Sequence, residues 1–538
     1  MYADFILKKT PVVLTQIDRD EHSRTYGSCD RSHWHLKIRD FTSAILQQSG
    51  LVLALLYDTN FEGNIYYQNE NMKVWAEATV RYWCKIQLND GSFNEYYPWE
   101  HGFPPTAFSL YAVCEVYKQL HMHDMQIEEK IRKTTQYLGG HIEKEAFNQE
   151  IASITGMYSA YTILKEKGIL DALEKKLERV LDLQDKEGWF PEYGGADIGY
   201  LSVALDMLAE YYWISHDKRV LEPLDRVVSF LKYFVHPDGT IGGEYGSRNT
   251  TYFLPNGLEV MSHLGNSDAD AMLQKLYSNA EKENFFLDSV DDRYLSHYLL
   301  HSFLRALKKR NTQEGTSGIG SLPMDASHIK SFTSSGLVTF CQGGFSGVIG
   351  MRKGGVIKLY RNGKEIMVNC GYRINLGNGT VAGTNWQDPS YECQYGADSF
   401  TVKGQFNKIS LKTSTPFLHM GLRGAAFLAG NRIIGLLKKK IILVDKHYDV
   451  SFERSITISE HEVKIIDQIQ SPRPVNVEVA GNMSLRHVAS GKFFMTSDLL
   501  RKQDKQFENI KLLRVETVIS TEKEMIEESY EQLARIER

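Results

Sequence analysis

Asp90-Gly-Ser-Phe-Asn-Glu-Tyr96 is the first of three related segments that decide the fold of this chain. The second is Glu187-Gly-Trp-Phe-Pro-Glu-Tyr193, and the third is Asp238-Gly-Thr-Ile-Gly-Gly-Glu-Tyr245. The first two share the pattern Asp/Glu-Gly-x-x-x-Glu-Tyr, and the third has one extra residue before its glutamate. Each segment lies between stretches with helical apolar spacing, so each is expected to join an outgoing helix to a returning one.

The spacing of the repeated glutamates indicates the size of the repeating unit. Glu95 and Glu192 are 97 residues apart, and Glu192 and Glu244 are 52 residues apart. A helix pair with its loops takes about 50 residues, so the first interval holds two units and the second holds one. The skipped unit falls near Glu143. Helical hairpins repeated at a fixed period cannot bury their apolar faces alone, so we expect about five or six pairs to stack into an (α/α) toroid.

The character of the chain changes after this helical half. Residues 311–336 are rich in Gly and Ser and are expected to form a linker. Beyond them the apolar period drops towards two, with turn residues roughly every 8–12 positions, which indicates an antiparallel β-sandwich. We therefore expect an α+β chain of several domains, with a toroid at 1–310 and a large antiparallel β-sandwich at 337–538. The helical composition from Glu522 onward predicts a short C-terminal helix.

Composition excludes several classes of protein. The 538 residues include 62 Lys and Arg against 67 Asp and Glu, and this net charge of −5 argues against a nucleic-acid partner. No apolar run approaches the roughly 18–20 residues that span a bilayer, so no membrane partner is expected. The N-terminus has no signal-peptide pattern, which predicts a cytoplasmic protein, or a periplasmic or secreted one if a leader has been removed. The six cysteines form no CxxC pair, and nothing in the sequence determines an oligomeric state.

Polar and aromatic side chains recur in the repeat loops. Equivalent loops of a toroid emerge on one face, so their side chains should converge there. Non-repeated residues of these loops, such as His101, are the stronger site candidates, because a purely structural role would favour sameness. The alternative for each repeated glutamate is that it ties down its own loop, and the alternative for a loop tryptophan is packing at a domain interface. The residues expected to contact substrate are Glu95, Trp99, Glu192, Tyr193, Asp197, Tyr200 and Glu244, with Trp386 from a long loop of the β half.

The first repeat loop resembles a known motif. Asp90-Gly91, Glu95, Pro98 and His101 look like the D-G-x-x-x-E-x-S-P-x-Y-H signature of heparinase II/III-like polysaccharide lyases. The resemblance implies an (α/α) toroid followed by an antiparallel β domain, and cleavage of uronate-containing, glycosaminoglycan-like polysaccharides. It carries His101 over as a functional residue. Glu100 stands where the family has its proton-transfer tyrosine, so that role does not carry over to this position.

The third repeat loop supplies groups that suit β-elimination. A uronate carboxylate must be neutralised before the adjacent proton can be removed, and Arg248 and Asn249 are suited to this. His101 is the candidate base, Tyr252 the candidate proton donor to the leaving oxygen, and Tyr245 its reserve. The reaction requires no cofactor, and a structural divalent metal is not supported by any ligand spacing.

Three alternatives to an acidic-polysaccharide lyase stay open from the sequence. A glycoside hydrolase on the same scaffold would need two carboxylates, which Glu95, Glu192, Asp197 and Glu244 could provide. A uronate C5 epimerase would use nearly the same proton-abstracting groups as a lyase. A glycan-binding protein without activity would keep the loops and lack the base.

Overall fold

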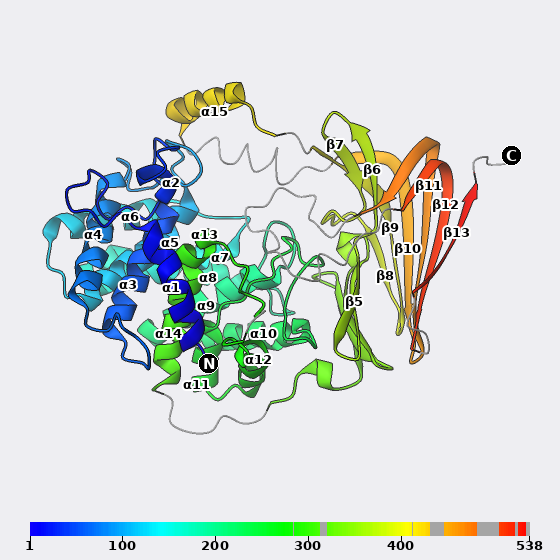
Figure 1. Cartoon of the computed structure of the whole chain (residues 1–538), viewed down its shortest axis with the longest axis horizontal. Coiled ribbons are helices and arrows are strands. Elements are labelled where there is room, and N and C mark those ends of the chain that lie inside the picture. Colours follow the sequence, from blue (N-terminus) through cyan, green and yellow to red (C-terminus); the bar gives the residue numbers. More distant parts are fainter. Residues whose placement is uncertain are drawn as a thin grey trace.

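The computed structural model describes residues 1–282, 285–312, 320–410, 413–430, 446–480, 505–521 and 526–533. Helices form the N-terminal half and strands the C-terminal half (Figure 1). The helices are α1 (Ala3–Gln16), α2 (Arg31–Trp34), η1 (Ala44–Gln48), α3 (Ser49–Asp58), α4 (Glu70–Ile86), α5 (Phe103–Gln119), α6 (Met125–Gly140), α7 (Phe147–Leu164), α8 (Lys167–Asp182), α9 (Ile198–Ser215), η2 (Lys218–Val220), α10 (Leu221–Leu231), η3 (Lys232–Phe234), α11 (Asn256–His263), α12 (Ser267–Tyr277), α13 (Asp292–Tyr294), η4 (Leu295–Leu299), α14 (Leu300–Arg310), η5 (Pro323–Asp325), η6 (Met351–Lys353) and α15 (Pro416–Ala429).

The helices form a closed double ring. Contacts between inner helices run from α3 to α5, α7, α9, α11 and α14, and α14 returns to α3. Most residues of an inner helix such as α7 or α9 are buried. Outer helices such as α8 and α10 bury one stripe only, as their helical apolar period predicts. The expected (α/α) toroid is therefore confirmed.

A buried ion network joins two neighbours of the inner ring. Arg305 on α14 donates to Asp206 of α9, and to Glu210 on the same helix at 3.1 Å. The Lys309 ammonium also donates to Glu210, at 2.8 Å. All four side chains are buried, so each charge depends on its partners for compensation.

The C-terminal half forms two antiparallel sheets. One has the order β1-β2-β3-β4-β5, and the larger has the order β10-β9-β7-β6-β11-β12-β13, with β8 paired to β9 and β10 also paired to β11. The strands are β1 (His328–Phe332), β2 (Leu337–Gln342), β3 (Phe345–Gly350), β4 (Val356–Arg361), β5 (Lys364–Asn369), β6 (Tyr372–Gly377), β7 (Thr380–Gly383), β8 (Glu392–Tyr395), β9 (Ser399–Ser410), β10 (His447–Ile458), β11 (Glu462–Val479), β12 (Gln506–Ser520) and β13 (Glu527–Leu533).

The two sheets face each other across one core, as expected for a sandwich. Phe340 and Ile357 of the smaller sheet belong to the same buried cluster as Phe400 and Ile465 of the larger one. The smaller sheet also lies against the toroid (Figure 1). Phe332 of β1 contacts the ring of Phe230 on α10, with ring centroids 5.0 Å apart.

Three details differ from the sequence-based expectation. The segment 311–336 is not only a linker, because β1 lies within it and pairs with β2. The prediction of a C-terminal helix from Glu522 onward is wrong over Glu527–Leu533, because these residues form β13 on the edge of the larger sheet. Residues 522–525 and 534–538 of this prediction lie outside the described residues. A helix, α15, was not expected within the β half. The domain boundaries themselves stay a prediction.

The repeated glycine has a specific structural task. Gly91 and Gly188 have φ values of +90° and +108°, which side chains rarely adopt. A Cβ atom at either position would lie 2.2 Å from a backbone carbonyl oxygen of the next outer helix, that of Lys133 or Arg226. These two repeat loops therefore lie directly against the backbone of the next outer helix, and only glycine permits so close an approach.

We predict that Gly91→Ala or Gly188→Ala lowers the free energy of unfolding by about 2–4 kcal/mol, because backbone strain and a clash with a carbonyl add. Denaturant unfolding followed by circular dichroism measures the loss. Gly265→Ala is the matched control, since Gly265 has φ +83° with no atom near its Cβ position. It should cost only about 1 kcal/mol. Equal losses at all three glycines would contradict the close-contact explanation.

Candidate active site

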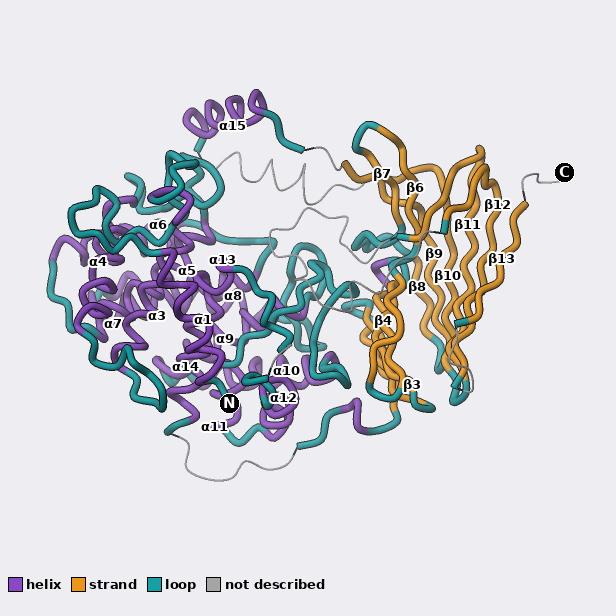
Figure 2. The backbone as a smooth tube through the Cα atoms, in the orientation of Figure 1, coloured by secondary structure: helices purple, strands orange, loops and turns teal. Residues whose placement is uncertain are grey.

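The repeat loops lie beside one another, and much of the loop structure gathers between the helices and the sheets (Figure 2). Tyr137 of α6 donates a hydrogen bond from its hydroxyl to the His101 carbonyl at 2.6 Å, which ties the first repeat loop to the helix before Glu143. The Tyr193 amide donates to the Glu145 carbonyl at 2.7 Å, and the Ser247 amide to that of Ala196 at 2.9 Å. Hydrogen bonds therefore connect each loop to the next.

Arg248 is the most unusual charged group of these loops. It is 4% exposed, and its Nε and Nη1 atoms have no hydrogen-bond partner among the described residues. The guanidinium carbon lies 4.1 Å from the ring centre of Tyr193 and 6.0 Å from that of Tyr200, so aromatic faces hold it. The Arg248 backbone amide donates a hydrogen bond to the Asp197 carboxylate at 2.9 Å, which fixes the backbone of the loop that carries the guanidinium. Donors buried without a partner are costly, and an anion would satisfy them.

Asn249 is oriented by a lysine from the other half of the chain. The buried Lys353, at the end of η6, donates to the Asn249 side-chain oxygen and, at 2.5 Å, to the Gly246 carbonyl. An ammonium can only donate, so the oxygen of the Asn249 amide must face Lys353. The amide nitrogen, a donor, is thereby turned the other way.

Glu192 is a buried carboxyl group close to Arg248. Its Oε2 accepts a hydrogen bond from Asn148 at 2.6 Å, while Oε1 has no partner among the described residues. Burial raises the pKa of Glu192 to about 8, although the Asn148 hydrogen bond and the Arg248 charge lower it in part. The group therefore holds a proton at neutral pH.

His101 forms a carboxylate–imidazole pair in the first loop. Its Nδ1 lies 2.6 Å from Asp90 Oδ2 and 3.0 Å from the Ser92 hydroxyl oxygen. Burial opposes ionisation of Asp90, but hydrogen bonds from His101 and Ser92 outweigh it and lower the pKa of Asp90 to about 2. The imidazole is partly exposed, and its Cδ2 and Nε2 atoms lie beside Gly430 at the end of α15, while Asp90 holds Nδ1.

The other acidic residues of the first loop hold the loop together. Glu95 is buried and accepts a hydrogen bond from Arg293. Glu100 accepts from the backbone amides of Glu95 and Tyr96 at 2.6 and 2.7 Å. Burial and the Glu95 charge raise the pKa of Glu100 well above its usual range. The residue at the position of the family's tyrosine therefore closes a turn.

A cluster of tyrosine side chains lies beside Arg248. The rings of Tyr200 and Tyr252 meet edge to face with centroids 6.1 Å apart. Tyr252 is buried and also contacts Tyr294 and Tyr298. Tyr200 is half-buried, so it is the more accessible phenol of this cluster.

Four residues expected at the site are in packed or structural positions. Tyr245 is buried and bonds His236 at 2.9 Å, and the buried Glu244 lies 3.8 Å from Lys358 of β4. Trp386 is buried in a small cluster of the larger sheet. Asp197 caps α9 and binds backbone amides of the third loop. These surroundings disfavour substrate contact, and Trp99 instead lies exposed beside Phe427 of α15.

Four of the twelve non-glycine residues with positive φ in the described structure are candidate site residues. Trp99, His101, Tyr193 and Asn249 have φ values between +49° and +58°, in the left-handed region that non-glycine residues seldom occupy. Such conformations persist only where the surroundings hold them, and they cluster at functional sites. The repeat loops therefore combine strain with unsatisfied buried polar groups.

Sequence reasoning missed the partners that come from elsewhere in the chain. Lys353 and Arg293 lie about 100 and 200 residues from the groups they bind, and no local pattern marks them. Asp90 could have been found, because it opens the repeat motif that ends at His101. No cluster of three or more possible metal ligands occurs in the described parts of the chain.

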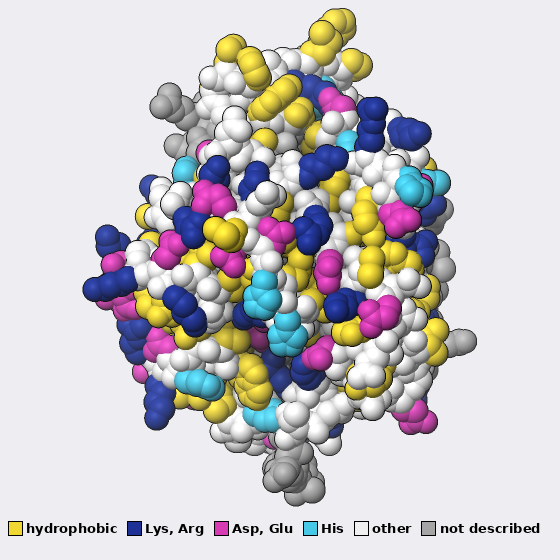
Figure 3. Space-filling model, turned by 90° about the vertical axis from the view of Figure 1, so that its left-hand side faces the viewer, with side chains coloured by type: hydrophobic (Ala, Val, Ile, Leu, Met, Phe, Trp, Pro, Cys, Tyr) yellow, Lys and Arg dark blue, Asp and Glu magenta, His cyan; other side chains and the backbone are white. Residues whose placement is uncertain are grey.

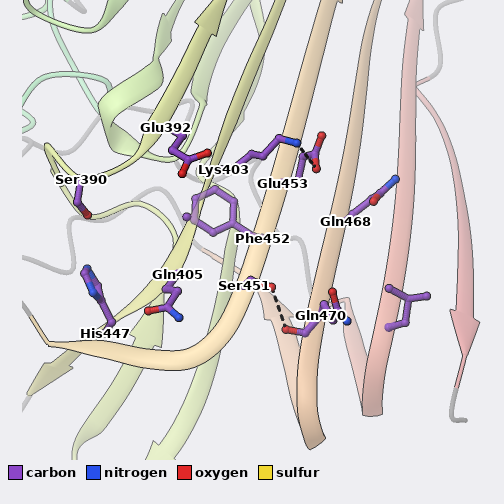
Figure 4. Close-up of a pocket in the computed structure, with 12 residues that line it drawn as sticks. Ser390, Glu392, Lys403, Gln405, His447, Ser451, Phe452, Glu453, Gln468 and Gln470 are labelled. Carbon is purple, nitrogen blue, oxygen red and sulfur yellow. Dashed lines mark hydrogen bonds and ion pairs between the residues drawn. The ribbon is translucent and has the colours of Figure 1, made fainter. Parts of the chain in front are cut away.

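A separate depression of about 400 Å³ lies on the larger sheet (Figure 4). Gln405, Gln468 and Gln470 line it, with Lys403 paired to Glu453 at 3.0 Å. It contains no toroid residue, and exposed polar side chains are usual on the solvated face of an antiparallel sheet. We assign it no role.

Comparison with known proteins supports the fold. No family model matches the chain, and no curated protein matches it. The chondroitin AC lyase of Streptomyces coelicolor A3, solved with chondroitin sulphate, matches with a TM-score of 0.52 at 11% identity, over 90% of this chain and 67% of that one. The chain therefore shares the fold of this polysaccharide lyase.

Two further structures have lower scores. Heparinase III matches with a TM-score of 0.43 at 11% identity, over 95% of this chain and 81% of that one. A family 88 glycosyl hydrolase from Bacteroides vulgatus matches with a TM-score of 0.39 at 11% identity, over 56% of this chain and 98% of that one.

The raised pKa of Glu192 predicts a pH dependence of stability. Between the ordinary value of 4.5 and about 8, the folded state keeps a proton that the unfolded state has released. The stabilisation from this proton is therefore complete at low pH and is lost as the pH rises towards 8. Glu192→Gln, which does not titrate, should lose less free energy of unfolding between pH 5 and pH 8 than the wild type, by a few kcal/mol.

Denaturant unfolding at both pH values measures this difference. Glu222→Gln is the control, because Glu222 is exposed on α10 and should leave the pH profile of the wild type unchanged. Parallel profiles for wild type and Glu192→Gln would show that Glu192 is ionised in the folded protein.

Proposed function

We propose that this chain is a polysaccharide lyase that cleaves a uronate-containing polysaccharide by β-elimination. The observation that carries the proposal is the buried Arg248 guanidinium, whose Nε and Nη1 donors have no partner among the residues that the structure describes. A carboxylate is an anion that guanidinium N–H groups bind through charge-assisted hydrogen bonds. A bound uronate would satisfy donors that the described part of the chain leaves without a partner.

Arg248 and Asn249 supply the electrostatic part of the reaction. Removing the proton beside a carboxylate places negative charge on the carboxylate oxygens. Donors already fixed in position stabilise that charge without reorganising. The Asn249 amide nitrogen is a donor of this kind, because Lys353 holds the oxygen of the same amide. Both residues belong to one loop whose backbone Asp197 anchors.

His101 is the proposed base. Asp90 orients its ring through Nδ1 and stabilises the imidazolium that forms when the other nitrogen accepts the C5 proton of the uronate. The electron pair of the broken C–H bond then forms the C4–C5 double bond, and the glycosidic C–O bond at C4 breaks. The departing oxygen takes a proton from the tyrosine cluster, where Tyr200 is the accessible phenol and Tyr252 supports it.

The hydrolase alternative fits the carboxylates less well. Hydrolysis needs two carboxyl groups free to act on one bond. Glu95 is bound by Arg293, Asp197 by a helix end and a loop, and Glu244 lies beside Lys358. Glu192 keeps its Oε1 without a hydrogen-bond partner in the described structure, but one such carboxyl group does not make the pair that hydrolysis requires. An epimerase would share the proton abstraction and differ in its product.

A panel of uronate polysaccharides, starting with chondroitin sulphate and heparan sulphate, tests the proposal. Elimination creates an unsaturated uronate that absorbs in the near ultraviolet, together with a new reducing end. Reducing ends without absorbance would indicate hydrolysis. An inverted C5 centre without chain cleavage would indicate epimerisation. Binding without any product would indicate a non-catalytic protein, and each of these results would overturn the lyase assignment.

Arg248→Met should lower kcat/KM by about 10²–10³-fold, because it removes charge stabilisation from the transition state. Arg248→Lys keeps the charge and loses the paired donors, so it should retain part of the activity. Arg226→Met is the matched control, since Arg226 lies on the outer helix α10 and contacts Gln184 and Glu222. Full activity of Arg248→Met would remove this residue from the mechanism.

His101→Ala should abolish activity while the protein stays folded, and Asn249→Ala should do the same. Asp90→Asn should lower kcat by about 10²-fold or more, because the imidazole loses the charge that orients it and stabilises its protonated form. The rate is measured by near-ultraviolet absorbance and the fold by circular dichroism. An active His101→Ala variant would show that another group removes the proton.

A further inference from the structure

Helix α15 presents its apolar side chains to solvent. Its inner side makes few contacts: Ala426 is buried, and Arg423 forms a paired hydrogen bond with Asp40 at 2.6 and 2.9 Å. Phe417 and Leu428 are 83% and 84% exposed. A helix of a globular protein normally turns this kind of face inward, so the outward arrangement is unusual.

The exposed apolar surface continues onto the toroid. Leu36 and Ile38 are exposed and lie just before Asp40, the residue that anchors α15. Trp99 is exposed and contacts the Phe427 ring, with ring centroids 5.3 Å apart. We call this surface the apolar patch; its residues are Leu36, Ile38, Trp99, Phe417, Leu418, Met420, Phe427 and Leu428.

The charge around the apolar patch is positive, in a chain whose net charge is −5. Helix α15 contains one arginine and no Asp or Glu. Residues 31–40 contain Arg31, Lys37 and Arg39 against one acidic residue, Asp40. Figure 3 shows hydrophobic side chains gathered at the top of the molecule, where α15 lies in Figure 1, with Lys and Arg side chains below them.

We propose that the apolar patch binds the surface of an anionic lipid bilayer. An outward apolar helix with basic neighbours can lie in the bilayer interface, its apolar side chains among the acyl chains and its cations at the lipid phosphates. A second copy of the chain fits less well, because two such patches would bring like charges together. No helix in the described residues is long and apolar enough to cross a membrane, so the contact is with one surface.

The lack of an apolar run long enough to span a bilayer, from which no membrane partner was expected, does not exclude a site of this kind. An interfacial helix is recognised by where its apolar residues point and not by their number. The proposal does not depend on the proposed enzymatic function, and its test requires no substrate.

Co-sedimentation of the full chain with lipid vesicles tests the proposal. Vesicles of phosphatidylcholine with phosphatidylglycerol should bind the wild type at least about tenfold more strongly than phosphatidylcholine alone, and high salt should weaken that binding. The double variant Phe417→Ser, Leu428→Ser should lose about tenfold or more of the binding. The variant Arg31→Glu, Lys37→Glu should lose the preference for anionic lipid.

The double variant Ile65→Ser, Met125→Ser is the matched control, because these apolar side chains are 78% and 84% exposed and lie outside the apolar patch. It should bind like the wild type, and circular dichroism checks the fold of every variant. Absence of wild-type binding to both vesicles, or equal binding by the Phe417→Ser, Leu428→Ser variant, would overturn the proposal. So would a wild-type dimer in light scattering that this variant converts to a monomer.

Discussion

A constraint that recurs around the toroid is the approach of a loop glycine to a backbone carbonyl of the next outer helix. It is a contact between backbones, so it leaves the other side chains of the loop free to vary. It also sets how far each loop can lie from the following repeat, and so aligns the loops at one end of the ring. The pairs are Gly27 with Ala78, Gly91 with Lys133, Gly188 with Arg226 and Gly239 with Lys275.

A scaffold held in this way can carry groups that would destabilise an ordinary loop. Among the described residues, the buried donors Nε and Nη1 of Arg248 have no hydrogen-bond partner, and neither has Oε1 of Glu192. His101 and Asn249 occupy left-handed backbone conformations. Each feature has a cost in folding free energy, which the packing of the rings must offset. The repeated glycines thus fix the positions of the loops, and the proposed function rests on residues that differ between the repeats, such as His101 and Arg248.

Local patterns of apolar residues predicted the fold, but they did not predict contacts between residues far apart in the sequence. Helical and strand periods separate the toroid from the sandwich, because burial of one face imposes them. Helix α1 contains Pro11, a residue that normally breaks a helix, so the local sequence does not mark this segment as helical. The repeat loops were located correctly, yet Glu244 faces Lys358 of the β half. Which loop residues stay accessible depends on how the β half packs against the loops, and local sequence does not contain that information.

The bond between Lys353 and Asn249 makes the third repeat loop a joint product of both halves of the chain. During synthesis the toroid leaves the ribosome first, with the amide of Asn249 still free to rotate. The amide acquires a single orientation only after η6 has been made and has docked. The orientation of this amide therefore depends on the C-terminal half, and a chain truncated before Lys353 would lack the ammonium that fixes it.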